Sequence, residues 1–343
     1  MGGSAGAVPA LLTLVPALPP DFPAPILLVV HTPADQPSYL PELLSRAGPL
    51  PARHARHGDP LEPGSIFIAP PDHHLLVVGG HLHLSRGPRE NLARPAIDVL
   101  FRSAAEVYGA QVIGVLLSGM LNDGTSGLWT IEQLGGRTIV QHPEEAEYPE
   151  MPLSALRHVT VDQILRAGEI GPRLVSWLQE LGVEGGGSSM DEEGRRRLTA
   201  EVAVGAGNNT FDNGVLTQGP PSTLTCPECH GVLGQIEEGG LTRYRCHTGH
   251  AFTAEVLLSE LRRQGEAALW NAARVLDEQV MVLDHLGQRA GSEEGAARRE
   301  EARVILERGE VLRQFTQRTG EGEPHASSSP AAAPQVPQEP PGR

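Results

Sequence analysis

Several features that would place this chain in other protein classes are scarce or missing. Only three of the 343 residues are cysteine, an odd number and too few for a disulfide framework. Lys and Arg total 27 against 42 Asp and Glu, a net charge of −15, so we expect no basic surface for nucleic acid. The sequence shows neither a secretory leader nor an apolar run of about 18 to 20 residues. These absences predict a cytoplasmic protein that binds no nucleic acid and is not embedded in a membrane.

The sequence divides into five segments that differ in composition. Residues 1–182 carry alternating strand-like and helix-like patterns, which predict one α/β domain. Residues 183–223 are rich in Gly, Asn and charge, and predict a flexible linker. A compact Cys/His unit occupies residues 224–252, and the helical period of residues 253–318, interrupted at GSEEG, predicts a helical hairpin. We expect residues 319–343, a Pro- and Ala-rich tail, to be disordered.

The first segment has the pattern of a Rossmann-like, doubly wound sheet. Short apolar runs predict buried strands at PAPILLVVH, SIFIAP, QVIGVLLSG and RTIVQ. Apolar residues recur at helical spacing in residues 8–18 and 38–44 and in RPAIDVLFRSAAEVYG and GLWTIEQLG, which predicts helices there. HHLLVVGGHLHLS alternates on both sides of two glycines, which is typical of an antiparallel hairpin. The predicted fold is α/β: a doubly wound, mostly parallel sheet with an antiparallel hairpin, followed by a small zinc-ribbon-like unit and a helical hairpin.

Three loops that follow, or should follow, buried strands carry polar side chains. Ser4 lies in GGSAGA at the start of a helix, His31 ends the ILLVV strand, and Asp123 lies in SGMLNDGTSG. In an open α/β sheet, functional residues collect outside the carboxyl ends of the strands. A serine needs a base to become a nucleophile, histidine can take its proton near neutral pH, and a carboxylate orients the imidazole. Ser4, His31 and Asp123 are therefore candidate catalytic residues of a hydrolase.

Each of the three motifs also has a simpler explanation. GGSAGA is compatible with a flexible N-terminus or a phosphate-binding loop, although it lacks the Lys-Ser/Thr of a P-loop and the third glycine of a dinucleotide fingerprint. His31 fits a histidine hydrogen-bonded at a strand end, and NDG is a common turn sequence. The strand that should precede Ser4 is almost absent, which would remove the anchor of the nucleophile. From the residues alone, the choice stays open.

Longer motifs, taken in order, resemble one enzyme family. Residues 1–170 resemble the catalytic domain of the chemotaxis protein-glutamate methylesterase (CheB) family. The motifs that carry this resemblance are GGSAGA, VVH, LEPGSIFIAPPDHHLLV, RPAIDVLFRSAA, SGMLNDGTSGL, GGRTIVQ and MPLSAL. The resemblance implies hydrolysis of glutamate γ-methyl esters on a methyl-accepting chemotaxis receptor or a related methylated signalling protein. Family members often also deamidate glutamine. The reaction implies no cofactor.

The resemblance also implies roles for individual residues. It places the nucleophile at Ser4, the base at His31 and the carboxylate at Asp123. Met120 would lie beside the site, where its backbone would help to bind the oxyanion. Arg94 would contact the acidic receptor peptide.

The sequence departs from the family pattern in three ways. Ala7 stands where the family loop usually has its second glycine, and little sequence precedes the loop to form the usual strand. The phosphorylation-controlled receiver domain is absent from these residues, so control is expected to come from elsewhere or to be missing. These departures leave an alternative function, a catalytically degenerate methylesterase-like protein that acts as a binding module or scaffold.

All three cysteines lie in CPECHGVLGQIEEGGLTRYRCHTGH. Cys226 and Cys229 form a C-x2-C pair, and Cys246 and His250 form a C-x3-H pair. Two close pairs on separate turns can surround Zn²⁺ as a tetrahedron, which predicts one structural zinc. Reduced surface thiols with an unrelated histidine are the alternative to a metal site. Competing candidates for the fourth ligand are His247 and His230. A similar RCxxGH ribbon followed by helices accompanies some methylesterase-like chains.

Overall fold

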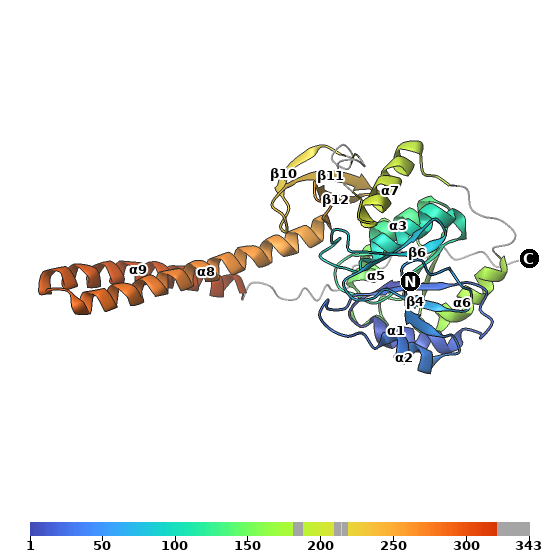
Figure 1. The fold of residues 1–343 in the computed structure, drawn as a ribbon, viewed down its shortest axis with the longest axis horizontal. Helices are drawn as coiled ribbons and strands as arrows, with labels where there is room; N and C mark the ends of the chain where they lie inside the picture. Colours follow the sequence, from blue (N-terminus) through green and yellow to red (C-terminus); the bar gives the residue numbers. More distant parts are fainter. Residues whose placement is uncertain (181–187, 209–213, 215–218, 321–343) are drawn as a thin grey trace, which may run out of the picture. The chain divides into compact units, whose positions relative to one another are not determined.

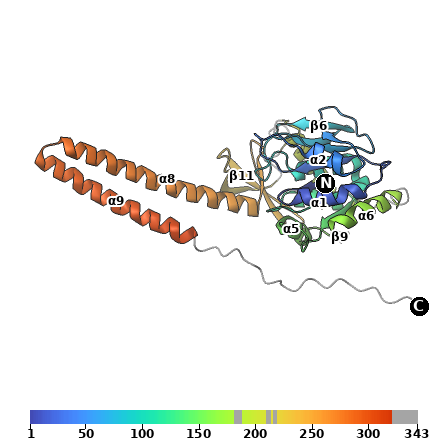
Figure 2. The same ribbon diagram turned by 90° about the horizontal axis from the view of Figure 1, so that it is seen from below.

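The structure is a computed structural model that describes residues 1–180, 188–208, 214 and 219–320. The chain forms two compact units, Met1–Ser259 and Glu260–Arg343, which are described in turn. Figures 1 and 2 show the ribbon from two directions. Of the predicted tail, residues 321–343 lie outside the described residues.

The first unit is built on a seven-stranded sheet in the order β3-β4-β2-β1-β7-β8-β9. Every pair of neighbours in this sheet is parallel. The central strands are apolar because helices cover both faces of the sheet. The strands are β1 (Gly2–Gly3), β2 (Ile26–Val30), β3 (Ala52–His54), β4 (Ile66–Ile68), β7 (Ile113–Leu116), β8 (Arg137–Gln141) and β9 (Gln163–Leu165). The two edge strands, β3 and β9, are three residues long and were not predicted from the sequence.

Helices cover both faces of the sheet, and each face has its own apolar core. One core includes side chains of α1 (Ala7–Leu14), α2 (Leu40–Ala47) and α6 (Ala167–Glu180). The other includes side chains of α3 (Ile97–Tyr108), α4 (Thr125–Gln133) and α5 (Glu150–His158). Two short 3-10 helices, Val15–Ala17 and Gly109–Gln111, follow α1 and α3. The predicted doubly wound architecture is confirmed.

The predicted antiparallel hairpin is also present. Strands β5 (His74–Val78) and β6 (His81–Ser85) pair with Val78 opposite His81. Gly79 and Gly80 connect them with φ angles of 56° and 79°, which glycine adopts without steric cost. The hairpin packs through Leu75, Leu76 and Leu82 on the same core as α3.

The strand before Ser4 is short but present. β1 consists of Gly2 and Gly3, both buried, and pairs with β2 on one side and β7 on the other. A Cβ on Gly2 would lie 2.2 Å from Ile97, so the close approach of β1 to α3 requires glycine. An apolar cavity of about 310 Å³ lies beside Met1, between the first residues of β2 and β7. The sequence suggests that the strand before Ser4 is almost absent. In the structure, the two paired residues of β1 suffice to place Ser4 at the carboxyl edge of the sheet.

The predicted flexible linker over residues 183–223 is wrong for part of its length. Helix α7 (Glu192–Gly205) lies within it, and Asp191 caps the helix by accepting a 2.8 Å hydrogen bond from the Gly194 N–H. Leu198 and Val202 of α7 pack on the core that includes α3. The local composition conceals this helix because only a narrow side of it is apolar. Residues 183–187, 209–213 and 215–218 of the predicted linker lie outside the described residues.

The Cys/His unit is a four-stranded antiparallel sheet in the order β10-β11-β12-β13. Its strands are β10 (Pro221–Thr225), β11 (Val232–Glu238), β12 (Leu241–Cys246) and β13 (Ala251–Thr253). Its apolar core is small and contains Cys226, Leu233, Cys246, Phe252, Val256 and Leu257.

Two long helices follow. Helix α8 (Ala254–Arg289) begins in the first unit and continues into the second, where α9 (Ser292–Gly320) follows it. Arg313 of α9 donates hydrogen bonds of 2.7 and 2.8 Å to the carboxylate of Asp277 on α8, and Ala273 and Ala302 are buried. None of the described helices is long and apolar enough to cross a membrane.

Candidate active site

The candidate catalytic side chains meet at the carboxyl ends of the three central strands. Ser4 follows β1, and His31 follows β2. Asp123 lies in the loop between β7 and α4. β1 is the point at which the sheet order reverses, since β2 and β7 flank it on opposite sides. Ligands bind outside the strand ends at such a switch point in open α/β sheets.

A chain of hydrogen bonds connects the three residues. The Ser4 Oγ lies 3.1 Å from His31 Nδ1, and His31 Nε2 lies 2.8 Å from Asp123 Oδ2. Asp123 cannot donate when it is ionised, so the ring proton belongs on Nε2, and Nδ1 is free to accept from Ser4. His31 is partly exposed, whereas the Asp123 side chain is buried, with only 3% of its surface accessible. The arrangement can transfer a proton from Ser4 to a histidine oriented by a carboxylate.

Asp123 is held as an anion by donors from helix α3. The Ile97 N–H donates to Oδ2 at 2.6 Å, and the Asp98 N–H lies 3.4 Å from Oδ1. These groups belong to the first turn of α3, where the helix dipole favours negative charge. Burial alone would raise the pKa of Asp123, but hydrogen bonds from His31, Ile97 and Asn91 outweigh it and lower the pKa.

A second buried carboxylate, Asp98, lies beside Asp123. It accepts hydrogen bonds from the Gly127 N–H at 2.7 Å and from Asn91 Nδ2 at 3.0 Å. Burial, together with the charge of Asp123, raises the pKa of Asp98 to about 8. The pKa values of these two adjacent carboxyl groups are therefore shifted in opposite directions. Of the two, Asp123 is the one that contacts His31.

The glycine-rich loop positions Ser4 tightly. The Ser4 N–H donates to the Ser118 carbonyl at 2.9 Å, and the Ala7 N–H donates to the Ser4 carbonyl at 3.1 Å. Gly6 has a φ of 73° and precedes the first residue of α1, so a residue with a side chain would be strained there. Ala7 is the first residue of α1 and is completely buried. The replacement of the family glycine by Ala7 therefore leaves the loop intact.

Met120 lies on the open side of the site. Its side chain is 51% exposed. The preceding Gly119 N–H donates to the Tyr148 carbonyl at 3.0 Å, and the following Leu121 N–H donates to Glu150 at 3.0 Å. The Met120 amide therefore lies between two engaged amides, and its role at an oxyanion stays a prediction.

Arg94 lines a hollow of about 430 Å³ that also includes His31, Asn91 and Asp72. Its guanidinium donates to Asp72 at 2.9 and 2.6 Å and to the carbonyls of Arg86 and Gly87. Arg94 is thus near the histidine, but Asp72 already neutralises its charge. Contact with an acidic peptide stays a prediction for this residue.

Comparison with known families agrees with this geometry. The family model described as CheB methylesterase matches residues 1–174, which is just over half of the chain. The chain belongs to the CheB methylesterase family. Residues 1–174 are called the methylesterase domain from here on. The match supports a hydrolase over the degenerate scaffold that the sequence left open.

Relatives and a solved structure cover the same region. A putative protein-glutamate methylesterase/protein-glutamine glutaminase of Leptospira interrogans is 37% identical over 171 residues, 50% of this chain and 89% of that relative. Protein-glutamate methylesterase/protein-glutamine glutaminase 2 of Anaeromyxobacter dehalogenans is 40% identical, but the match covers only 50% of each chain. The crystal structure of the Thermotoga maritima CheB methylesterase catalytic domain is 33% identical, with a TM-score of 0.50, over 51% of this chain and 95% of that one.

The four predicted metal ligands also come together. Cys226, Cys229, Cys246 and His250 each place one ligand atom within 4.8 Å of the others. Cys226 Sγ and Cys246 Sγ lie 3.7 and 3.6 Å from His250 Nδ1, and the sulfurs of Cys229 and Cys246 are 3.5 Å apart. Ligands at about 2.3 Å from zinc stand roughly 3.7 Å apart at the corners of a tetrahedron, so the cluster fits such an ion. The alternative ligands, His247 and His230, are not part of this group.

Several polar residues around the site were not identified from the sequence. Asn91 donates a hydrogen bond to Asp123, and Asn122 precedes Asp123 in the sequence. Glu90 is buried and pairs with Arg102. Asn122 could have been noticed because it precedes Asp123 in the NDG turn. Asn91 and Glu90 carry no comparable signal, since they lie in an irregular loop and their partners are distant in sequence.

Proposed function

We propose that this chain hydrolyses glutamate γ-methyl esters on a methyl-accepting chemotaxis receptor or a related methylated signalling protein. The hydrogen-bonded series from Ser4 through His31 to Asp123 carries the proposal, because it joins a nucleophile, a base and an orienting carboxylate at the switch point of the sheet. The names of the family and of its relatives supply the substrate class. A reduced cytoplasmic compartment suits a site with three thiol ligands.

Each group has one task in the proposed reaction. The Ser4 Oγ attacks the ester carbonyl carbon, and its proton passes to His31 Nδ1. His31 then gives this proton to the departing methoxy group, which leaves as methanol. Water attacks the acyl-serine, His31 takes a proton from the water, and the proton returns to Ser4 Oγ. Asp123 stays ionised throughout and stabilises the imidazolium.

Two further residues complete the proposed site. The Met120 N–H would donate to the oxyanion of the tetrahedral intermediate, as the family resemblance implies. Arg94 would face the acidic receptor helix with the part of its guanidinium that Asp72 leaves accessible. Glutamine deamidation would follow the same steps, with ammonia leaving in place of methanol.

Methanol release from a methylated receptor fragment tests the proposal. Ser4→Ala should abolish release because no other group in the site can form the acyl intermediate. Ser259→Ala, which changes an exposed serine on α8, is the matched control and should retain full activity. Methanol release by a folded Ser4→Ala variant at the unsubstituted rate would contradict the role of Ser4.

We also propose one structural zinc ion, held by Cys226, Cys229, Cys246 and His250. The distances within the cluster and its donor set support zinc, and Glu228 lies 3.4 Å from His250 Nε2, where a carboxylate would orient this ligand. When bound, the ion would cross-link two turns of a unit whose apolar core is small. Elemental analysis of protein purified without added metal should give about one zinc per chain. Three freely titratable thiols with no bound metal would contradict the proposal.

A further inference from the structure

The Cys/His unit pairs with the methylesterase domain next to the catalytic carboxylate. The Ala251 N–H of β13 donates to the Arg89 carbonyl at 3.2 Å, and the Asn91 N–H donates to the Ala251 carbonyl at 2.8 Å. These bonds form a parallel bridge between Ala251 and Glu90. Ala251 directly follows His250, the fourth ligand of the Cys/His cluster. The metal-binding turn therefore continues directly into a strand that lies on the loop carrying Asn91.

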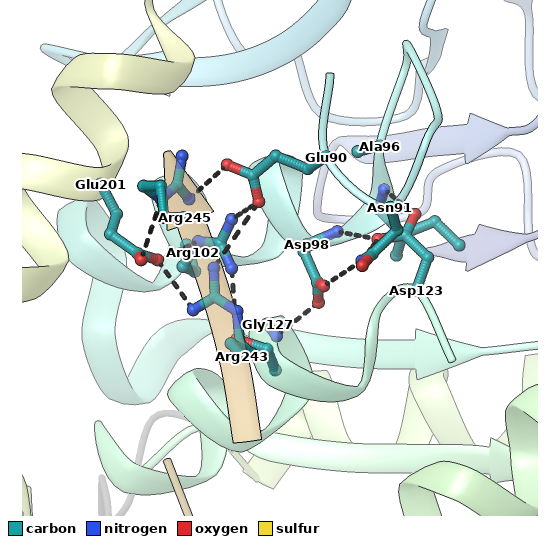
Figure 3. A network of polar contacts seen from close by, with 12 residues as sticks. Glu90, Asn91, Ala96, Asp98, Arg102, Asp123, Gly127, Glu201, Arg243 and Arg245 are labelled. Atoms are coloured by element: carbon teal, nitrogen blue, oxygen red, sulfur yellow. Dashed lines mark hydrogen bonds and ion pairs between the residues drawn. The ribbon is translucent and has the colours of Figure 1, made fainter. Parts of the chain in front are cut away.

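The side chain of Asn91 connects this strand to the candidate triad. The Thr253 N–H donates to Asn91 Oδ1 at 3.0 Å. Because a backbone N–H can only donate, the amide oxygen must face Thr253 and the NH2 group must face the opposite way. Its two hydrogens are directed to Asp123 Oδ1 and Asp98 Oδ2, both at 3.0 Å. Figure 3 shows Asn91 with these two carboxylates.

Thr253 also holds the residue before the catalytic carboxylate. Its hydroxyl donates to Asn122 Oδ1 at 2.7 Å, and Asn122 Nδ2 donates to Glu255 at 2.8 Å. Both asparagines that adjoin Asp123 are thus fixed by residues 253 and 255. The methylesterase domain supplies the carboxylate, and the segment after the metal ligands fixes its neighbours.

Buried charges fasten the unit in this position. We call Arg102, Arg243 and Arg245, with Glu90, Glu201 and Glu238, the Arg/Glu cluster; all six are at most 7% exposed. Arg245 donates to Glu90 at 2.7 Å and to the Gly249 carbonyl at 2.8 Å. One guanidinium therefore joins the loop of Asn91 to the turn that contains Cys246 and His250. Figure 3 shows five members of this cluster, Glu90, Arg102, Glu201, Arg243 and Arg245, beside Asp98 and Asp123.

We propose that Asn91 is a positioning residue for the triad, and that the Cys/His unit controls the reactivity of Ser4 by holding the Asn91 amide. Asn91 acts through Asp123: with one N–H directed to the Asp123 carboxylate and the other to the carboxyl group of Asp98, Asp123 keeps the orientation that presents Oδ2 to His31. When the Cys/His unit opens, the Thr253 N–H is withdrawn and the amide is free to rotate. The inference rests on the proposed role of Ser4 as nucleophile, but not on the identity of the receptor.

Two substitutions of Asn91 test the first half of the inference. Asn91 has a φ of 51°, a left-handed conformation that Gly and Asp also adopt readily, so both replacements suit the backbone. Asn91→Gly removes the amide, and Asn91→Asp keeps an acceptor for Thr253 but loses both donors to the carboxylates. Asn271→Ala, which changes an exposed asparagine on α8, is the matched control.

The main readout is the rate at which a fluorophosphonate labels Ser4 in the full chain, with Ser4→Ala as the blank. This reagent needs no receptor, so a failure of the receptor assay and a failure of this inference are distinguishable. We expect both Asn91 variants to be labelled at least about tenfold more slowly, and Asn271→Ala to stay within about twofold. Unchanged labelling of either Asn91 variant, folded by circular dichroism, would overturn the inference.

A spectroscopic readout separates positioning from a general loss of structure. The proton between His31 and Asp123 should give a low-field proton NMR signal that needs the hydrogen bond to be intact. It should shift or disappear in Asn91→Asp while the thermal transition of the folded chain persists. An unperturbed signal in that variant would contradict a positioning role.

A double-mutant cycle tests the second half. Cys229→Ser removes one thiol of the cluster and leaves the methylesterase domain unchanged. It should slow labelling of the otherwise unsubstituted chain by at least about fivefold, and have no further effect in Asn91→Gly, because the connection is already broken there. An equal slowing in both backgrounds would overturn the route through Asn91. Unaltered labelling of Cys229→Ser would overturn control by the Cys/His unit.

Discussion

The methylesterase domain and the Cys/His unit are ordered by different forces. In the first, two extensive apolar cores cover both faces of a parallel sheet, and side chains such as Phe67 and Leu28 are completely buried. In the second, the apolar core consists of a few side chains around Cys226 and Cys246. Its largest fully buried side chains include two arginines, Arg243 and Arg245.

The difference teaches how a small unit can be held in one orientation. Apolar contacts are non-directional, so a large core stabilises a fold without fixing the rotation of a small neighbour. Buried charges must find matched partners, and breaking such a pair is costly. The Arg/Glu cluster therefore supplies orientation where the Cys/His unit lacks apolar area. The following predictions test this division, from the largest expected effect to the smallest.

The largest effect should be on the rate of ester hydrolysis, with no effect on metal binding. His31→Gln removes the proposed base and should lower ester hydrolysis by at least about 10³-fold, because Ser4 loses its proton acceptor. The metal content should not change, because His31 is not a member of the Cys/His cluster. Methanol release and elemental analysis on the same preparation measure both. His285→Gln, at an exposed histidine on α8, is the control; a similar loss of activity there would contradict the assignment of His31.

Removing a large side chain from the domain core should weaken folding. Phe67→Ala deletes a completely buried ring from β4 and should cost about 3 to 5 kcal/mol of the free energy of unfolding. Val78→Ala, at a residue that is 42% exposed, should cost much less. Urea denaturation followed by circular dichroism measures the difference. Equal costs at the two sites would show that the apolar core does not dominate.

The same substitution at two arginines should separate buried from exposed ion pairs. Arg243→Met leaves Glu238 and Glu201 with fewer partners in a buried place, and should cost about 3 to 5 kcal/mol. Arg313→Met breaks a pair with Asp277 that is about a third exposed, and should cost about 1 kcal/mol or less. Thermal denaturation of both variants checks the ratio. A neutral Arg243→Met would mean that orientation does not depend on the Arg/Glu cluster.

The pH dependence of stability should carry the signature of Asp98. Its pKa is raised from 3.8 to about 8, so between these values the folded chain holds a proton that the unfolded chain has released. Stability from this group is present below about pH 4 and falls as pH rises towards 8, by at most about 1.4 kcal/mol per pH unit. Asp98→Asn should flatten the curve of unfolding free energy against pH.

Asp162→Asn is the matched control for that experiment, because the Asp162 carboxylate accepts hydrogen bonds from the N–H and the hydroxyl of Thr138. The loss of slope in Asp98→Asn should exceed any change of slope in this control. The Asp98 interpretation fails if Asp98→Asn and the unsubstituted chain give parallel curves from pH 5 to 8. Asp123, with its lowered pKa, contributes in the opposite sense and loses its stabilising effect only at acid pH.

Most of the sheet could be predicted from the sequence, because its strands are short apolar runs with clear boundaries. β2, β4, β7 and β8 were identified in this way. β3 and β9 were missed because three-residue edge strands carry too little pattern. α7 was missed because its composition is mostly polar, like that of a linker. The few apolar residues on one side of it become recognisable as a buried face only once the core that they cover is known.

The candidate site shows the same division. Ser4, His31 and Asp123 could be proposed from residue type and from their places after strands, since the carboxyl ends of parallel strands share one edge. The spacing of the cysteines likewise predicted the cluster with His250. Asn91 could not be predicted, because its function comes from partners about 30 and 160 residues away.

The sequence by itself determined strands β2, β4, β7 and β8, the antiparallel hairpin, the helices with a wide apolar face, and which residues were candidates for the triad and for the Cys/His cluster. These depend on local patterns and on fixed spacings, which sequence preserves. Only the tertiary structure decided that two glycines suffice as the central strand, and that Asp98 and Asp123 have opposite pKa shifts. It alone placed Thr253 against Asn91, because burial and hydrogen-bond geometry between distant segments exist only once the chain has packed.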